Sequence, residues 1–332
     1  MARSLVSVII TAYRSGPYLA ETIESALAQT LGDREIVVVD DGTPDASVQR
    51  IVARHPGVRY LRQRNAGGGI ARNTGVRATS SEYVAFLDHD DLWRPDKLAV
   101  QLEVARRHPE SGLIACDGDG FDGERILRSR LVDGPLAARL DAAPDGELTG
   151  FFYREFVPAN PIACPAQTLI PRRVIERIGP QTSNWPFAAD ADYWLRIAGA
   201  YPVTLHRDAL ARYRYLPSSL SGPRDLRRAR WELRRARLLG HHLRRHVPPG
   251  ERGFAVATLR AHLLGAARVA YLRSRRRERG PVWAQFARLL PFVRHQPAIV
   301  LYLLAAGLPE AVVDALARIT RRLQVGAEIA RR

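Results

Sequence analysis

Hydrophobic and polar positions follow a regular alternation of strands and helices over the first hundred residues. Four segments rich in strand-forming residues have the length of strands, at 5–10, 35–39, 58–62 and 83–87. The segments between them carry apolar residues at helical spacing, at 18–30, 47–54 and 70–78. Strands that alternate with helices in this way predict an α/β fold built on a mostly parallel, doubly wound sheet.

Polar residues follow each predicted strand at the point where it ends. They are, in chain order, Thr11-Ala12-Tyr13, Asp40-Asp41, Asn65 with the glycines after it, and the segment from Asp88 to Asp91. In an open parallel sheet, ligands bind beyond the carboxyl ends of the strands. The sequence therefore predicts a binding site along this edge of the sheet.

The acidic turn Asp88-His89-Asp90-Asp91 is the most unusual of these segments, because three carboxylates next to a buried strand repel one another. Oxygen ligands clustered in this way suit a hard divalent ion such as Mg²⁺ or Mn²⁺, which usually binds one or two carboxylates together with a phosphate. By itself, the pattern favours a solvated acidic turn that closes a strand, and only its neighbours can change this interpretation.

The loop Asn65-Ala66-Gly67-Gly68-Gly69 opens the third predicted helix. Backbone N–H groups at a helix N-terminus bind phosphate well, and Arg72 on the first turn would add a positive charge. Glycine-rich turns between strands and helices are common, however, and this loop matches neither G-x-G-x-x-G nor a Walker loop. The segment alone leaves a tight turn and a phosphate site as alternatives.

Five segments taken together resemble the family 2 inverting glycosyltransferases of GT-A fold. They occur in the family's order and at similar spacing: Val6–Tyr13, Ser25–Thr30, Val39–Thr43, Asn65 with Gly67 and Ala71–Gly75, and Phe86–Asp91. The resemblance extends from residue 5 to about residue 221. It implies a nucleotide-sugar donor and a divalent cation, Mn²⁺ or Mg²⁺.

The resemblance also implies roles for individual residues. Asp40 or Asp41 would hydrogen-bond the base of the donor, with uracil favoured. In the D-x-D segment, Asp90 would bind the metal directly, and Asp88 would reach the ribose or a metal-bound water. His89 would be a spacer, and Asp91 would cap the turn. Further donor contacts are implied for Thr11, Ala12, Tyr13, Asn65, Gly67, Arg72 and Arg214.

The general base is expected in Ala189-Asp190-Ala191-Asp192-Tyr193-Trp194-Leu195-Arg196, where the family shows Glu-Asp-x-Asp-x-x-x-Arg. A carboxylate is needed because the attacking hydroxyl must lose its proton. The resemblance selects Asp190 as the base, with Asp192 as the alternate. Ala189 stands where the family has Glu, which removes a neighbouring charge.

The segment from 117 to 186 lacks readable motifs. A strand is expected at 111–116 and an irregular stretch at 117–150, in which Asp117, Asp119 and Asp122 are interpreted as solvated turn residues. Two interpretations stay open for Trp185, core packing or contact with an acceptor sugar. Arg214 has two as well, a diphosphate contact from a mobile loop or a surface salt bridge.

Charge separates the C-terminal third from the rest. The 332 residues carry a formal charge of +16, but residues 222–332 hold 24 arginines and seven acidic residues, or +17, which leaves −1 for residues 1–221. We therefore expect a transferase domain at 1–221 and a basic, amphipathic helical region at 222–332. This region would either lie on an anionic membrane surface or pack on the catalytic domain as an appendage.

The expected function is transfer of a sugar from a nucleotide-sugar, with a UDP-sugar favoured, to a hydroxyl of a glycan or lipid-linked glycan in cell-surface polysaccharide synthesis. With two cysteines at no metal or redox spacing and no secretory leader or membrane span, a cytoplasmic location is expected, peripheral on the inner face of the membrane if the basic region binds lipid. One alternative is a non-catalytic nucleotide-sugar-binding protein, for which Ala189 is the support. Nucleic-acid binding through the arginine-rich tail is a less favoured alternative.

Overall fold

The computed structural model describes residues 4–182, 189–216, 235, 238–243, 245–259 and 261–262. The chain divides into two compact units, Met1–Gly222 and Pro223–Arg332. This division lies one residue from the boundary that the change in charge predicts. Trp185 lies outside the described residues.

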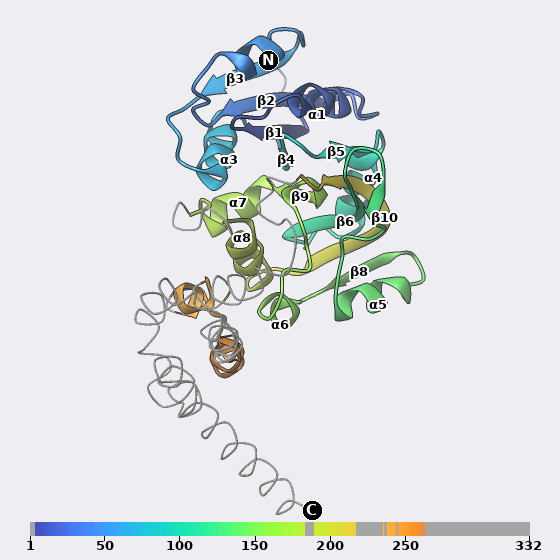
Figure 1. Cartoon of the computed structure of the whole chain (residues 1–332). Helices are drawn as coiled ribbons and strands as arrows, with labels where there is room; N and C mark the ends of the chain where they lie inside the picture. Colours follow the sequence, from blue (N-terminus) through green and yellow to red (C-terminus); the bar gives the residue numbers. More distant parts are fainter. Residues whose placement is uncertain are drawn as a thin grey trace, which may run out of the picture. The chain divides into compact units, whose positions relative to one another are not determined.

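The first half of the first unit is a parallel sheet with crossover helices (Figure 1). Its strands lie in the order β3-β2-β1-β4, with bounds Val6–Ala12 for β1, Arg34–Asp40 for β2, Val58–Arg62 for β3 and Tyr83–Asp88 for β4. The crossover helices are α1 (Tyr18–Leu27), α2 (Ser47–Val52) and α3 (Gly68–Arg77). All seven elements were predicted, and their ends differ from the predicted ends by three residues or fewer.

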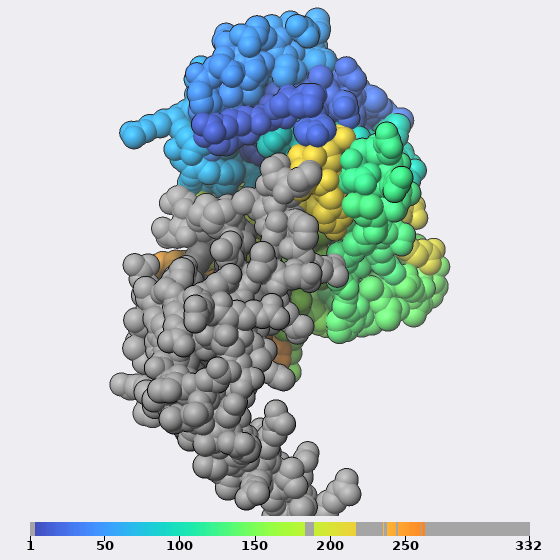
Figure 2. All heavy atoms as spheres, viewed as in Figure 1, coloured from blue at the N-terminus to red at the C-terminus, as the bar shows by residue number. Residues whose placement is uncertain are grey.

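The second half continues the same sheet with mixed strand directions. Beyond β4 the order is β9-β6-β10-β5, with bounds Thr168–Pro171, Leu113–Phe121, Val203–Arg214 and Leu92–Trp93. Strand β9 runs antiparallel to both β4 and β6, whereas β6 and β10 are parallel to each other. In the space-filling view, the blue first half and the green second half of this unit adjoin directly (Figure 2). The predicted α/β fold with a mostly parallel central sheet is confirmed.

The prediction of an irregular stretch at 117–150 is wrong. Strand β6 extends to Phe121, and β7 (Ile126–Arg128), α5 (Pro135–Asp141) and β8 (Glu147–Gly150) follow. Glycine and aspartate are rare in strands, so the sequence Asp117-Gly118-Asp119-Gly120 hides the end of β6. A side chain at Gly118 would overlap the backbone oxygen of Ala211 on β10, so glycine is needed there.

The two aspartates of this strand are also not solvated turn residues. Asp117 is buried and accepts hydrogen bonds from the backbone of Leu131 and Val132, both at 2.9 Å, and from Nε of Arg130 at 2.7 Å. Asp119 is buried and pairs with Arg212 on β10 at 3.0 Å. Burial is tolerated because each carboxylate gains charged or backbone partners.

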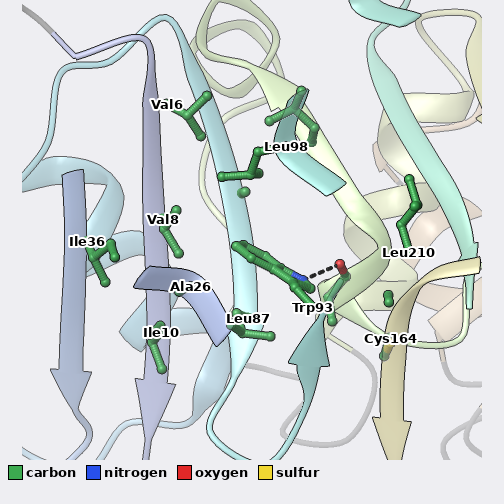
Figure 3. Packing of buried hydrophobic residues seen from close by; sticks show 14 of the residues in the cluster. Val6, Val8, Ile10, Ala26, Ile36, Leu87, Trp93, Leu98, Cys164 and Leu210 are labelled. Carbon is green, nitrogen blue, oxygen red and sulfur yellow. Dashed lines mark hydrogen bonds between the residues drawn. The ribbon is translucent and has the colours of Figure 1, made fainter. Parts of the chain in front are cut away.

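Helices cover both faces of the sheet. Helices α1, α2 and α4 (Lys97–Arg107) pack on the face of the sheet that carries Val6, Val8 and Ile10. Figure 3 shows these three side chains in the core together with Leu87, Trp93 and Leu98. On the other face, a side chain at Gly75 of α3 would overlap Ile9. Helices α7 (Arg172–Ile178) and α8 (Ala189–Ala198) pack near α3, and the 3₁₀ turn η1 (Pro165–Gln167) and helix α6 (Tyr153–Phe156) complete the unit.

Strand register brings the predicted polar segments together. Thr11 at the end of β1 is paired with Asp88 at the end of β4, and Ala12 is paired with Asp40 at the end of β2. Three segments from separate parts of the sequence therefore end at the same edge of the sheet.

In the second unit, the described residues include helical segments at 238–243 and 252–259. Their apolar positions Leu238, Leu239, Leu243, Ala255 and Leu259 are all buried. Within the part of the chain that the structure describes, no helix is both long enough and apolar enough to cross a bilayer.

Candidate active site

Arg72 and Asp88 form the central ion pair of the carboxyl edge. Asp88 ends β4, and its Oδ1 accepts a hydrogen bond from the guanidinium of Arg72 at 2.6 Å and one from the hydroxyl of Thr11 at 2.9 Å. Burial acts to raise the pKa of Asp88, but Arg72 and Thr11 outweigh it, so this pKa lies below its ordinary value. Asp88 is therefore held as a carboxylate.

The pKa values of Asp90 and Asp91 are raised, in contrast to that of Asp88. Burial, together with the charge of Asp88, raises the pKa of Asp90, although His89 and Arg214 act against it. Burial and the charges of Asp90 and Asp88 raise the pKa of Asp91 well above its ordinary value. The three carboxyl groups of this turn therefore repel one another when ionised, and a nearby positive charge would offset this repulsion.

The donor set fits a divalent cation that is completed by phosphate. Oδ2 of Asp91 is buried and has no hydrogen-bond partner in the described part of the protein, while Asp90 is partly exposed beside it. Among the described residues, no three His, Cys, Asp or Glu side chains are grouped to hold a metal ion. Mg²⁺ and Mn²⁺ need only one or two protein carboxylates when substrate phosphates and water supply the other ligands.

Asp91 does not cap its own turn, in contrast to the expectation. Its side chain has no exposed surface, and Oδ1 accepts the backbone N–H of Arg214 from β10 at 3.0 Å. The carboxyl group therefore joins the acidic turn to a strand that lies more than a hundred residues later in the chain.

Asp190 lies on the first turn of α8 and also interacts with Arg72. Its Oδ1 accepts the N–H of Ala191 at 2.8 Å. Burial raises the pKa of Asp190, while the positive charge of Arg72 partly opposes the increase. Arg72 is itself buried, and the charges of Asp88 and Asp190 both favour its ionised form. The guanidinium thus pairs directly with the D-x-D segment, and its charge also acts on the predicted base.

The alternate base Asp192 is buried in an ion pair. It is 1% exposed and pairs with Nε of Arg196, one helical turn later, at 3.0 Å. Arg196 also donates to the carbonyl groups of Ile178 at 3.1 Å and Pro180 at 2.9 Å. This pair fixes the chain ahead of α8, so the geometry favours Asp190 as the base.

Ala189 packs closely against α3. A Cβ atom placed on Gly69 would lie 3.0 Å from the Cβ of Ala189. Asn73 of α3 adds a reciprocal pair with Gln181, donating to its carbonyl at 2.8 Å and accepting its N–H at 2.9 Å. Sequence reasoning gave Asn73 no role, although it lies inside one of the five quoted segments.

The predicted nucleoside residues divide into buried and exposed groups. Asp40 has no exposed surface, and its oxygens accept from the backbone of Thr43 and the hydroxyl of Tyr60, both at 2.8 Å. Ala12 is part of the hydrophobic core, so only its backbone is available to a ligand. Tyr13 is 38% exposed at the end of β1.

Asp41 organises the glycine loop. Its carboxylate accepts the N–H groups of Ala66 at 2.9 Å and Gly67 at 2.8 Å, and its backbone carbonyl accepts the side chain of Asn65 at 2.9 Å. Gly67 has a φ of 90°, a conformation that glycine adopts readily. The loop that precedes α3 is therefore tied to the end of β2.

Arg214 is not on a mobile loop, and its salt bridge joins a buried guanidinium to Glu21, whose side chain is 53% exposed. It ends β10, its side chain is 4% exposed, and it lies 4.6 Å from the ring centroids of both Tyr18 and Phe121. Its guanidinium donates to Glu21 at 2.6 Å and to the backbone carbonyl of Asp90 at 2.8 Å. The sequence does not reveal this burial, because the partners come from distant elements.

Curated proteins with a similar sequence include glycosyltransferases. An uncharacterized glycosyltransferase of Rickettsia felis is 31% identical over 216 residues, which cover 64% of this chain and 34% of the relative. Chondroitin synthase of Escherichia coli is 36% identical over 138 residues, 41% of this chain and 20% of the relative. The chain thus spans about a third or less of the length of these two curated relatives.

Solved structures share the fold. Residues 1–349 of Staphylococcus aureus TarS in complex with UDP-GlcNAc give a TM-score of 0.55 at 17% identity, covering 87% of this chain and 89% of that one. The mannosyltransferase PcManGT from Pyrobaculum calidifontis, in complex with GDP-Man and Mn²⁺, gives 0.57 at 21% identity, covering 92% and 86%. These similarities show a GT-A type fold. The family model for glycosyl transferase family 2 matches residues 7–178, and the chain belongs to this family.

Proposed function

We propose that this protein transfers a sugar from a nucleotide-sugar to a hydroxyl group of an acceptor, with inversion at the anomeric carbon and with the help of a divalent cation. One observation carries the proposal. Arg72 pairs with Asp88 of the D-x-D segment and interacts with Asp190, about a hundred residues later in the sequence. These two interactions of Arg72 support a metal-side carboxylate and a base acting in one site, as a displacement reaction requires.

The donor is proposed to bind along the ends of β1, β2 and β4. Tyr13 is exposed where a base would stack, and Asp41 with Asn65 and Gly67 would form the nucleoside side of the pocket. Structures of the same fold bind UDP-GlcNAc and GDP-Man. We favour a UDP-sugar on the family resemblance, with Asp40 or Asp41 as the base contact; both residues are buried.

Asp90 is proposed to hold the cation, Mn²⁺ or Mg²⁺, and Asp88 to reach the ribose or a metal-bound water. When bound, the cation would neutralise the charge that develops on the leaving diphosphate. Asp88 is suited to its role because Arg72 and Thr11 keep it ionised and fixed.

Asp190 is proposed to be the general base. The acceptor hydroxyl would pass its proton to the carboxylate as its oxygen attacks the anomeric carbon, and the diphosphate would leave with the bonding electrons. A carboxylate whose pKa is raised by burial is a stronger base than an exposed one. Single displacement with one base leads to inversion of the anomeric configuration.

We further propose a glycan or lipid-linked glycan as the acceptor, in cell-surface polysaccharide synthesis, and a cytoplasmic enzyme that binds the inner membrane surface. The charge of +17 on residues 222–332 supports attraction to anionic lipid. Leu238, Leu239 and Leu243 are buried in the protein, so the described part of this region would act through its charge.

The test is incubation with UDP-, GDP- and dTDP-sugars in the presence of Mn²⁺ or Mg²⁺, with release of nucleoside diphosphate as the first readout. We expect release with one donor, loss of activity in EDTA, and recovery when the cation is restored. The anomeric configuration of the transferred sugar, measured by NMR, tests inversion. A protein that binds a donor but neither transfers nor hydrolyses it would instead be a non-catalytic nucleotide-sugar-binding protein.

A further inference from the structure

Helix α1 and the residues just after it carry a buried polar stripe, formed by Thr22, Ser25 and Gln29. Their spacing of three and four residues places them on one side of the helix. Thr22 has no exposed surface, and Gln29 is 5% exposed. The family segment Ser25–Thr30 contains two of these residues, and the proposed function gives that segment no role.

The stripe contacts the backbone of the acidic turn and of the residues that follow it. The hydroxyl of Thr22 lies 2.9 Å from the carbonyl oxygen of His89 and 3.0 Å from that of Asp91, so it shares its proton between them. Ser25 accepts the N–H of Trp93 at 3.3 Å. These are backbone groups that no strand or helix ladder satisfies.

Gln29 extends the same arrangement by one more turn. Its amide nitrogen donates to the carbonyl of Arg94 at 2.7 Å, and its amide oxygen accepts the N–H of Leu98 at 3.0 Å. The backbone from residue 89 to residue 98 is therefore fixed by side chains of α1 and of the residue just beyond it.

A second contact holds the turn from the side of β10. Arg214 donates from Nε to the carbonyl oxygen of Asp90 at 2.8 Å. The three successive carbonyl groups of His89, Asp90 and Asp91 thus all accept hydrogen bonds from side chains, which belong to Thr22 and Arg214. The peptide planes on both sides of Asp90 are fixed in this way, and with them the direction of its Cα–Cβ bond.

Fixing the backbone matters because a carboxylate that is already oriented loses less conformational freedom when it binds a cation. Groups that orient a metal ligand commonly influence metal affinity almost as strongly as the ligand itself. In a turn where three carboxyl groups repel one another, the backbone would otherwise move them apart.

We propose that Thr22, supported by Ser25 and Gln29, is a positioning residue that holds Asp90 in the orientation that binds the divalent cation. The inference rests on the proposed function, because it takes Asp90 as the metal ligand. The buried polar stripe would then orient the metal ligand in addition to packing between α1 and the turn.

The test compares Thr22→Val, Thr22→Ser and Thr204→Val in the full chain. Thr204 is a matched control because it is a buried threonine whose hydroxyl bonds Ser111 and Thr149. It is paired with Ile114 on β6, whereas Arg214 is paired with Phe121, seven residues later, so Thr204 lies roughly 20 Å from the turn. Free Mn²⁺ is measured by electron paramagnetic resonance, with UDP or GDP present, and the melting temperature is recorded for each variant.

We expect Thr22→Val to weaken Mn²⁺ binding by about 10- to 100-fold, as for other groups that orient a metal ligand. Thr22→Ser, which keeps the hydroxyl, should bind Mn²⁺ within about threefold of the unmodified protein, and so should Thr204→Val. Both valine variants should lower the melting temperature, which separates a loss of stability from a loss of positioning.

Two results would overturn the inference, and only the second would also overturn the proposed metal site. If Thr22→Val binds Mn²⁺ as the unmodified protein does, Thr22 only stabilises the fold, and the proposed metal site is unaffected. If the unmodified protein does not bind Mn²⁺ with either nucleotide, the proposed metal site is wrong, and its positioning residue falls with it.

Discussion

At the scale of single residues, Asp190 and Asp192 place the same carboxylate in two different environments on α8. Asp190 is partly exposed, faces the charge of Arg72, and has a pKa raised by burial. Asp192 is committed to its ion pair with Arg196 inside the protein. A general base needs an environment like that of Asp190, whereas the buried ion pair of Asp192 contributes to the stability of the fold.

Asparagine substitutions at these two positions separate the roles. Asp190→Asn should lower kcat by about 10²- to 10⁴-fold, the usual contribution of a general base, with little change in donor affinity. Asp192→Asn should lower kcat less than tenfold but reduce the free energy of unfolding by about 3 kcal/mol, since it breaks a buried ion pair. Steady-state kinetics and urea unfolding measure the two effects, and the reverse pattern would make Asp192 the base.

The pH dependence of kcat/KM provides a second test of Asp190. A general base works only when deprotonated, so activity should fall as the pH decreases through its pKa, which burial places above the ordinary aspartate value. Arg72 lowers that pKa, so Arg72→Gln should move the acid limb of the profile to higher pH. An acid limb that stays in place would mean that another group is titrating.

The sequence predicts Asp88 and Asp90 at the carboxyl edge because they follow a strand, and the family resemblance adds Asp190 to the same site. It does not show that Arg214 and Asp91 are buried against each other, since that contact joins residues 123 positions apart. Side-chain burial depends on which distant elements pack together, and local patterns contain no information about that choice.

At the scale of elements, the apolar runs that predict strands succeed where the strand is buried on both faces. Strands β1, β2 and β4 are such cases. The two residues of β5 are too few to form a pattern, and the aspartates and glycines of β6 imitate a turn. The elements that sequence reasoning missed are those that owe their strand conformation to neighbours rather than to their own composition.

Helix α4 begins with an unusual residue, Lys97, the only lysine in the chain. It has no exposed surface, donates from Nζ to the carbonyl of Thr168 at 3.1 Å, and lies 4.1 Å from the ring centroid of Trp93. No carboxylate pairs with Nζ among the described residues. Burial lowers the pKa of Lys97 to about 8.

Stability should therefore depend on Lys97 in alkaline solution. Between pH 8 and the ordinary lysine pKa of about 10.4, the unfolded chain holds a proton that the folded protein has lost, so stability increases with pH. From pH 7 to pH 9.5, the unmodified protein should gain about 2 kcal/mol relative to Lys97→Met, which has no group to titrate. Urea unfolding of both proteins at the two pH values measures this gain, and the comparison cancels all other titrations. Parallel curves would show that Lys97 keeps its proton in the folded protein up to pH 9.5.

At the scale of the whole molecule, charge and chemistry lie in different parts of the chain. Residues 1–221 carry −1 and contain all the proposed site residues, whereas residues 222–332 carry +17. In the proposed function, the basic part responds to a charged surface and residues 1–221 carry out the transfer. Attraction to an anionic surface would bring the proposed enzyme to its proposed lipid-linked acceptor.

Sedimentation of the full chain with vesicles tests this separation. We expect binding to vesicles that contain anionic phosphatidylglycerol and none to pure phosphatidylcholine, because the attraction of arginine to lipid is electrostatic at roughly 1 kcal/mol per residue near the surface. Raising the salt to about 0.5 M should release the protein, since screening shortens the range of the interaction to a few ångströms. Binding that persists in high salt, or that does not distinguish the two lipids, would contradict electrostatic attraction. Competition by duplex DNA at low salt, with no effect of lipid, would instead favour nucleic acid as the partner of residues 222–332.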